Sequence, residues 1–166
     1  MKIYLIGMPG SGKSTMGRKI AQELLVAFVD LDREIEKREG KSVSQVFAEK
    51  GEDHFRQVES QVLLEWAASE KSFVMATGGG TPCFYKGIEV INKTGLSIFL
   101  DVQVSVLLSR LEKKSDRPLL HSSDATEKEG KLKTLRASRL KFYQAANITI
   151  ENADLSKLME AIHLRK

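Results

Sequence analysis

The sequence predicts an α/β protein with three layers, in which helices cover both faces of a parallel sheet. Three observations support this fold class. Short apolar runs alternate along the chain with longer segments in which apolar residues recur every three or four positions. The first apolar run, residues 2–6, leads directly into a glycine-rich loop that is followed by a helical pattern. The length of 166 residues suits one hydrophobic core, so we expect a single domain over 1–166.

The predicted strands are five apolar runs bounded by glycine, aspartate or polar turns. A Ser42–Gln45 capping box and Gly51 predict the start and the end of one short helix. The polar stretch 113–130 fits a cover over the site better than a packed element, and we place a lid at about 113–125. The strands are expected at 2–6, 26–29, 72–76, 96–100 and 148–150, and the helices from the loop to about 25 and at about 33–39, 42–51, 52–69, 85–92, 104–111, 131–146 and 155–164.

The glycine-rich loop, residues 7–15, has the phosphate-binding pattern G-x-x-x-x-G-K-[ST]. Its glycines allow successive backbone N–H groups to converge on phosphate oxygens, and the following helix points its positive N-terminus at the same anion. Lys13 supplies a cation for the β- and γ-phosphates, and the Ser14 hydroxyl can ligate the Mg²⁺ that bridges them. A turn that binds nothing is the alternative, but strand, complete motif and helix occur here in order. The predicted ATP-binding residues of the loop are Gly10, Ser11, Gly12, Lys13, Ser14 and Thr15.

Two further strands end in turns with unusual residues. Asp30 and Asp32 follow the second strand, and Gly78, Gly79 and Gly80 follow the third. Because the carboxyl ends of parallel strands share one edge of a sheet, we expect these residues to face the phosphate loop. Helix capping is the alternative role for the aspartates. Their coincidence with a phosphate loop favours chemistry, since phosphoryl transfer uses one carboxylate near Mg²⁺, usually through water, and another to orient the acceptor hydroxyl and take its proton.

Two arginines lie where a small anion could meet them. Arg139 lies on the apolar stripe of its predicted helix, where a guanidinium is costly unless an anion pairs with it. The alternative is an arginine whose stem packs while its charge reaches water. Arg56 lies near a helix start, and Glu59 three residues later could hold its side chain in place. With the triglycine turn, these arginines would form a pocket for a small carboxylate that carries hydroxyls.

Two other arginines belong to the nucleotide side. Arg117 lies in the polar cover, where closure could carry it over the phosphates, although a solvated loop charge is an equal alternative. Arg110 precedes the cover and could stack on an adenine ring.

Composition excludes several other classes. The formal net charge of +4 suits anionic small molecules, and without a Lys/Arg block we expect no nucleic-acid partner. Cys83 is the single cysteine, so an internal disulfide and a cysteine metal cluster are excluded. The histidines at 54, 121 and 163 are scattered, which disfavours a histidine metal site. No run of 18 apolar residues occurs, so we expect no membrane partner and a cytoplasmic location.

The motifs taken together resemble the shikimate kinase family over nearly the whole chain. The phosphate loop alone is shared with very many NTP-binding proteins, but the order and spacing of the other motifs are much more specific. One departure is Lys141, at a position where family members often carry proline. The residues that carry the resemblance are GMPGSGKST at 7–15, FVDLDREIE at 28–36, HFRQVE at 54–59, ATGGGTP at 76–82, DRPLL at 116–120 and SRLKFY at 138–143.

The resemblance implies a P-loop kinase fold with strand order 2-3-1-4-5 and transfer of the ATP γ-phosphoryl group to the 3-hydroxyl of shikimate, in the biosynthesis of chorismate and aromatic amino acids. It also implies that Lys13, Asp32 and Arg117 are catalytic, with Asp32 as base or orienting group. The implied substrate-binding segment is about 31–60. Shikimate would be bound by Asp32, Arg56, Gly78, Gly79, Gly80 and Arg139, Mg²⁺ by Ser14 and through water by Asp30, and ATP by the loop, Arg110, Arg117 and the Asn152–Ala153 turn.

Other functions remain open at this point. A kinase of the same fold could act on gluconate or on a nucleoside monophosphate, although the latter would need more converging arginines than Arg56 and Arg139. A catalytically silent nucleotide-binding module is the alternative from another class, and the intact Lys13, Asp32 and Arg117 disfavour it. We expect only small-molecule partners, ATP and shikimate, and a monomer.

Overall fold

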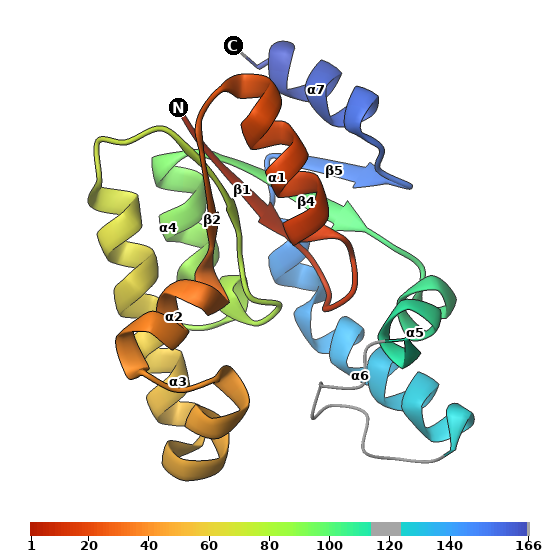
Figure 1. Ribbon diagram of the computed structural model, residues 1–166. Helices are drawn as coiled ribbons and strands as arrows, with labels where there is room; N and C mark the ends of the chain where they lie inside the picture. The colour runs from red at the N-terminus through yellow and green to blue at the C-terminus, as the bar shows by residue number, and fades with distance from the viewer. Residues whose placement is uncertain (114–123, 166) are drawn as a thin grey trace.

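The computed structural model describes residues 1–113 and 124–165, and its centre is a five-stranded parallel sheet (Figure 1). The strand order is β2-β3-β1-β4-β5, so the predicted topology is confirmed. The strand bounds lie within two residues of those predicted. They are β1 (Lys2–Ile6), β2 (Ala27–Asp30), β3 (Phe73–Ala76), β4 (Leu96–Asp101) and β5 (Ile148–Glu151).

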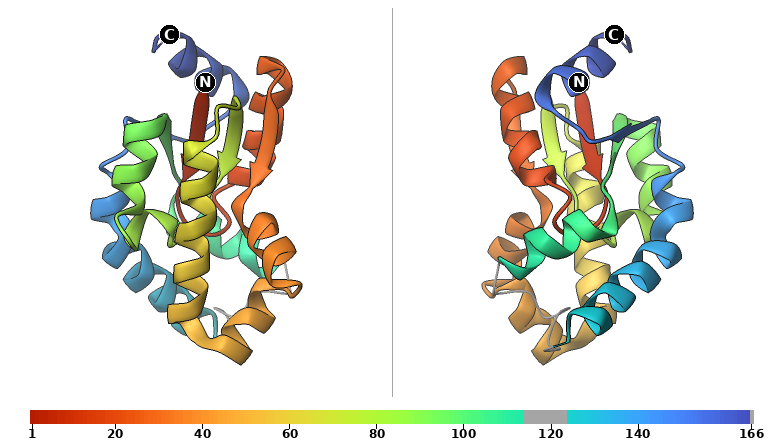
Figure 2. Two further views of the ribbon diagram at one scale, coloured as in Figure 1. Left: turned by 90° about the vertical axis from the view of Figure 1, so that its left-hand side faces the viewer. Right: turned by 90° about the vertical axis from the view of Figure 1, so that its right-hand side faces the viewer.

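Helices lie on both faces of the sheet, and β1 shows why (Figure 2). Tyr4 and Ile6 point into the core beneath α3, α4 and α6, whereas Ile3 and Leu5 point into the core beneath α1 and α7. This alternation, with all four side chains fully buried, is what a central parallel strand requires. The helices are α1 (Lys13–Leu24), α2 (Leu31–Glu39), α3 (Val43–Ala68), α4 (Gly87–Thr94), α5 (Val104–Glu112), α6 (Ala125–Tyr143) and α7 (Leu155–His163), with a short 3₁₀ helix η1 (Thr81–Cys83).

Several predicted helix bounds were wrong. α2 begins at Leu31 rather than at 33, α4 begins at Gly87 after η1 rather than at 85, and α6 begins at Ala125 rather than at 131. The first turns of α6 carry no apolar stripe. They are stabilised instead by the Asp124 side chain, which accepts a hydrogen bond from the Thr126 N–H, and by the i,i+4 pair Glu127–Lys131. Residues 114–123 of the predicted lid lie outside the described residues.

The predicted helix break at Gly51 is confirmed. α3 is continuous in outline, but Gly51 has φ 82° and ψ 172°, a non-helical conformation that separates two helical segments. The predicted capping box is also present at the start of α3: the Ser42 Oγ accepts from the Gln45 N–H, and the Gln45 side chain accepts from the Ser42 N–H.

The register of the central strands determines where the site lies. Leu5 pairs with Ala76, and Ala76 pairs with Asp30, so β1, β3 and β2 end at the same level. The phosphate loop, the triglycine turn (Gly78–Gly80) and the start of α2 therefore leave the sheet side by side. None of the helices within 1–113 and 124–165 combines the length and apolar character that a membrane span requires.

Candidate active site

The phosphate loop lies between β1 and α1 and depends on glycine at two points. A Cβ on Gly7 would lie 2.9 Å from the Leu100 carbonyl oxygen, so no side chain fits where the loop passes β4. Gly12 caps α1 with φ 95°, a left-handed conformation that glycine adopts readily. α1 thus begins directly at the loop, and the backbone N–H groups of a helix start are groups that bind anions.

Lys13 lies inside this loop and is almost fully buried, with 8% of its surface exposed. Its ammonium group donates to the carbonyl oxygens of Gly7 at 3.0 Å and Met8 at 2.9 Å. These bonds keep the cation against the loop, where the phosphates of a nucleotide would bring it a stronger anionic partner.

Ser14 and Asp30 are brought together from the start of α1 and the end of β2. The Ser14 hydroxyl donates to Asp30 Oδ2 at 2.8 Å. Hydroxyl and carboxylate oxygens are ligands that Mg²⁺ prefers, so this pair fits a Mg²⁺ ion at the phosphate loop.

The triglycine turn is approached by side chains from three different helices. A Cβ on Gly78 would lie 3.3 Å from Asp32 Oδ1, and one on Gly79 would lie 2.9 Å from Arg139 Nη1. A Cβ on Gly80 would lie 2.5 Å from the Arg56 guanidinium. Glycine at each position thus lets a predicted substrate residue reach the turn. The structure brings together Asp32, Arg56, Arg139 and the turn, as predicted.

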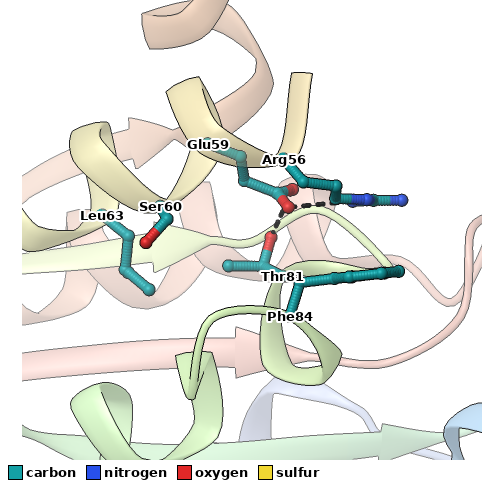
Figure 3. A pocket seen from close by; sticks show the side chains of 6 residues that line it. All are labelled: Arg56, Glu59, Ser60, Leu63, Thr81 and Phe84. Carbon is teal, nitrogen blue, oxygen red and sulfur yellow. Dashed lines mark hydrogen bonds and ion pairs between the residues drawn. The ribbon is translucent and has the colours of Figure 1, made fainter. Parts of the chain in front are cut away.

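Arg56 is held in a pocket between α3 and η1 (Figure 3). It donates through Nη1 to Glu59 Oε1 at 2.8 Å, and Thr81 Oγ1 donates to the other oxygen of Glu59, also at 2.8 Å. The Phe84 ring lies 4.4 Å from the guanidinium carbon. Glu59 is only 2% exposed, so this carboxylate needs both donors, and in return it fixes the orientation of Arg56.

The remaining predicted residues lie on the nucleotide side. Arg110 reaches the phosphate loop from α5 and donates to the Gly10 carbonyl at 3.2 Å. Ser11 is buried in the loop, and Thr15 is exposed on the first turn of α1. Asn152 follows β5 with φ 48° and is exposed. Arg117 lies outside the described residues.

Three residues at the site were missed by sequence reasoning. Thr81 and Phe84 contact Glu59 and Arg56, and Tyr143 contacts the triglycine turn through a hydrogen bond from its hydroxyl to the Gly79 carbonyl at 2.6 Å. A signal for Tyr143 existed: it lies four residues after Arg139, and hence on the same face of α6.

Burial is the largest cause of the pKa shifts of Tyr143 and Cys83, two groups near the triglycine turn. It raises the pKa of Tyr143 to about 12, and the nearby positive charge of Arg139 opposes this shift. It also raises the pKa of the Cys83 thiol, against the smaller opposing effects of Arg139 and Arg56. Cys83 is therefore a protonated thiol at neutral pH, which disfavours a role as nucleophile.

A phosphate loop at the end of the central strand, beside a carboxylate and two arginines that meet at one glycine turn, is the arrangement of a small P-loop kinase that uses ATP as a substrate. A family model described as shikimate kinase matches residues 9–164. The chain belongs to the shikimate kinase family.

Relatives and solved structures agree with this membership. A shikimate kinase of Bacteroides fragilis is 40% identical over 148 residues, which cover 89% of this chain and 82% of the relative. A shikimate kinase of Phocaeicola vulgatus is 46% identical over 127 residues, which cover 76% of this chain and 72% of the relative. The crystal structure of the Bacteroides thetaiotaomicron shikimate kinase has a TM-score of 0.92 at 36% identity, with 98% of both chains covered. The Acinetobacter baumannii shikimate kinase in complex with shikimate has a TM-score of 0.91 at 33% identity, covering 99% and 94%.

Proposed function

We propose that the protein transfers the γ-phosphoryl group of ATP to the 3-hydroxyl of shikimate, giving shikimate 3-phosphate and ADP. The observation that carries this proposal is the convergence of Asp32, Arg56 and Arg139 on one glycine turn, at the sheet edge that also holds the phosphate loop. A relative solved with shikimate supports the same acceptor. The product belongs to the biosynthesis of chorismate and aromatic amino acids.

The acceptor side of the site explains how a small hydroxy acid would be oriented. Arg56 and Arg139 would hold its carboxylate, Arg56 in an orientation fixed by Glu59. The backbone of Gly78–Gly80 can contact the ring closely because no side chain projects there. Asp32 would orient the 3-hydroxyl and accept its proton as the oxygen forms its bond to the γ-phosphorus and the bond to the β-phosphate oxygen breaks.

The donor side stabilises charge. The phosphate loop would bind the phosphates through its backbone N–H groups, and Lys13 would exchange its loop carbonyls for the β- and γ-phosphate oxygens. Mg²⁺, when bound, neutralises negative charge on these phosphates. Ser14 would ligate it directly and Asp30 through water. Arg117 would add a second cation, and Arg110 and Asn152 would border the nucleotide. We also propose a cytoplasmic monomer without a nucleic-acid partner.

ADP release in a coupled assay tests this function. With Mg²⁺ and ATP, we expect turnover with shikimate and little with gluconate or AMP, and phosphorus NMR of the product should place the phosphate on the 3-hydroxyl. Turnover with gluconate or AMP in preference to shikimate would replace the acceptor but keep the kinase class. ATP binding without turnover on any acceptor would support a catalytically silent module instead.

A further inference from the structure

Tyr143 is a buried residue at the end of α6 that contacts both halves of the site. Its side chain is fully buried, and its ring packs against Phe99 of β4 with a centroid distance of 5.1 Å. Its hydroxyl donates to the Gly79 carbonyl at 2.6 Å. The same hydroxyl lies 3.7 Å from the sulfur of Met8, which belongs to the phosphate loop. One hydroxyl therefore bridges the turn that would hold shikimate and the loop that would hold ATP.

Other contacts place these two segments directly against each other. A Cβ on Gly79 would lie 3.0 Å from Pro9 Cδ, so the turn and the phosphate loop are nearly in van der Waals contact without it. The Phe99 ring that packs against Tyr143 also approaches Gly7, where a Cβ would lie 3.6 Å from Phe99 Cδ2. A shift of the triglycine turn would therefore move it against the phosphate loop, and Tyr143 contacts both segments.

We propose that Tyr143 is a positioning residue that holds the triglycine turn against the phosphate loop and so couples the binding of shikimate to the binding of nucleotide. The proposal rests on the proposed function. The hydroxyl donates to a backbone carbonyl, and each substrate would contact one of the two segments that it joins. A nucleotide that orders the phosphate loop also orders the turn, and the acceptor then binds a site that is already formed.

The geometry and the chemistry of Tyr143 both exclude direct catalysis. Its hydroxyl is buried against Gly79 and Met8 and lies beside Arg139, so it would act on a substrate through these groups rather than by direct contact. Because burial raises its pKa to about 12, the side chain stays protonated and remains a hydrogen-bond donor throughout the neutral range. Arg139, four residues earlier on α6, would contact the carboxylate, so one helix carries both the ligand contact and the bond that fixes the turn.

Tyr143→Phe tests the proposal, and the chain offers a matched control. Tyr4 is also a fully buried tyrosine, its ring packs on Phe73, and its hydroxyl bonds to Thr94 rather than to the site. Tyr143→Phe and Tyr4→Phe each remove one buried hydroxyl and keep the ring. Both variants should therefore fold, which circular dichroism checks.

The measurement is the dissociation constant of shikimate, by calorimetry, with and without Mg²⁺ and a non-hydrolysable ATP analogue. In the wild-type protein we expect the nucleotide analogue to tighten shikimate binding by about fivefold or more. Tyr143→Phe should bring this ratio close to one and raise the KM for shikimate more than it lowers kcat. Tyr4→Phe should keep the wild-type ratio and KM.

Each contrary result has a distinct meaning. A wild-type ratio of one overturns the coupling role while shikimate turnover stands. So does a Tyr143→Phe protein that keeps the wild-type ratio, even if its KM for shikimate is raised, because Arg139 lies beside the hydroxyl and its loss of support alone would raise the KM. An equal fall of the ratio in Tyr143→Phe and Tyr4→Phe would show a general effect of losing a buried hydroxyl, and it would also overturn the coupling role. A wild-type protein that neither binds nor phosphorylates shikimate overturns the proposed function itself.

Discussion

Arg56 and Arg139 carry the same charge but are held very differently. Arg56 is 7% exposed and is bonded to Glu59, with Phe84 stacked on its guanidinium. Arg139 is half-buried on α6 and lies against Gly79. Removing Arg56 would leave Glu59 as a buried carboxylate without its cation, which destabilises the fold as well as the site. Arg139 is therefore the better residue for testing the carboxylate contact alone.

Arg139→Ala should raise the KM for shikimate with little change in kcat or in the KM for ATP. A hydrogen bond to a charged partner contributes about 1.5–3 kcal/mol, so we expect an increase of about 10- to 100-fold in KM. Steady-state kinetics with each substrate varied in turn measures this. Lys13→Ala is the contrasting variant, because loss of the phosphate-loop cation should lower kcat instead. An unchanged shikimate KM in Arg139→Ala would exclude the carboxylate contact.

Glu59→Gln should show how much the fixed orientation of Arg56 matters. The substitution keeps the shape of the side chain but removes the negative charge to which Arg56 and Thr81 donate. We therefore expect a loss of about 3 kcal/mol in the free energy of unfolding and a higher KM for shikimate. Glu52→Gln is the matched control. Glu52 also pairs with Arg56, at 3.3 Å, but its side chain is 56% exposed, so its loss should cost about 0.5 kcal/mol or less. Urea unfolding of both variants tests the difference, and equal losses would contradict it.

At the scale of elements, the strands were predicted better than the helix ends. An apolar run bounded by turns is a local signal, and all five such runs became strands of the sheet. The start of α6 was missed because its first turns are held by a cap at Asp124 and by surface ion pairs, which leave no apolar period. α2 was placed late because Leu31 and Asp32 were assigned to a turn between strand and helix.

The sequence predicted which residues would lie together where a motif or a charge stood out. Asp32 follows a predicted strand end, Arg139 is a charge on an apolar stripe and Arg56 has an acidic partner three residues later, and the three side chains lie near Gly78–Gly80 in the structure. Tyr143 was missed because a tyrosine in an apolar stripe looks like any core aromatic. Its proposed role rests on a hydrogen bond to a carbonyl 64 residues away in the sequence, and no local pattern predicts that pairing.

Gly51 and Gly130 offer a test of how backbone conformation shapes a helix. A Cβ would meet nothing within 4 Å at either position, so only the backbone distinguishes them. Gly51 has φ 82° and ψ 172°, a region that is nearly restricted to glycine, and Gly51→Ala should lower the free energy of unfolding by about 1–3 kcal/mol. Gly130 lies within α6, and Gly130→Ala should raise it by about 0.5–1 kcal/mol. Urea unfolding should show changes of opposite sign in the free energy of unfolding of the two variants. Changes of the same sign would contradict the role of backbone conformation at these glycines.

At the scale of the whole molecule, the site is assembled from five segments that are distant in sequence. The phosphate loop, the start of α2, the middle of α3, the triglycine turn and the end of α6 meet only because the strand order places β3 between β2 and β1. Two of the helices on one face of the sheet are α3 and α6 (Figures 1 and 2). They contain Arg56 and Arg139. Two helices that pack on that face thus also carry the acceptor side of the site.

Because the Tyr143 hydroxyl is buried, the free energy of unfolding of the whole protein should depend on its ionisation at alkaline pH. Burial raises the pKa of Tyr143 to about 12 in the folded state, whereas an unfolded tyrosine has a pKa of about 10. The folded protein therefore holds this proton more tightly than the unfolded chain. The resulting contribution to the free energy of unfolding, about 3 kcal/mol, is fully present below about pH 10 and is lost as the pH rises through about 12. Tyr143→Phe lacks this dependence. Urea unfolding of the two proteins should show a constant difference in free energy between about pH 7 and 9, where the tyrosine is protonated in both states, and a difference that narrows above about pH 10. A difference that stays constant up to about pH 11.5 would show that the folded protein does not resist ionisation at this residue.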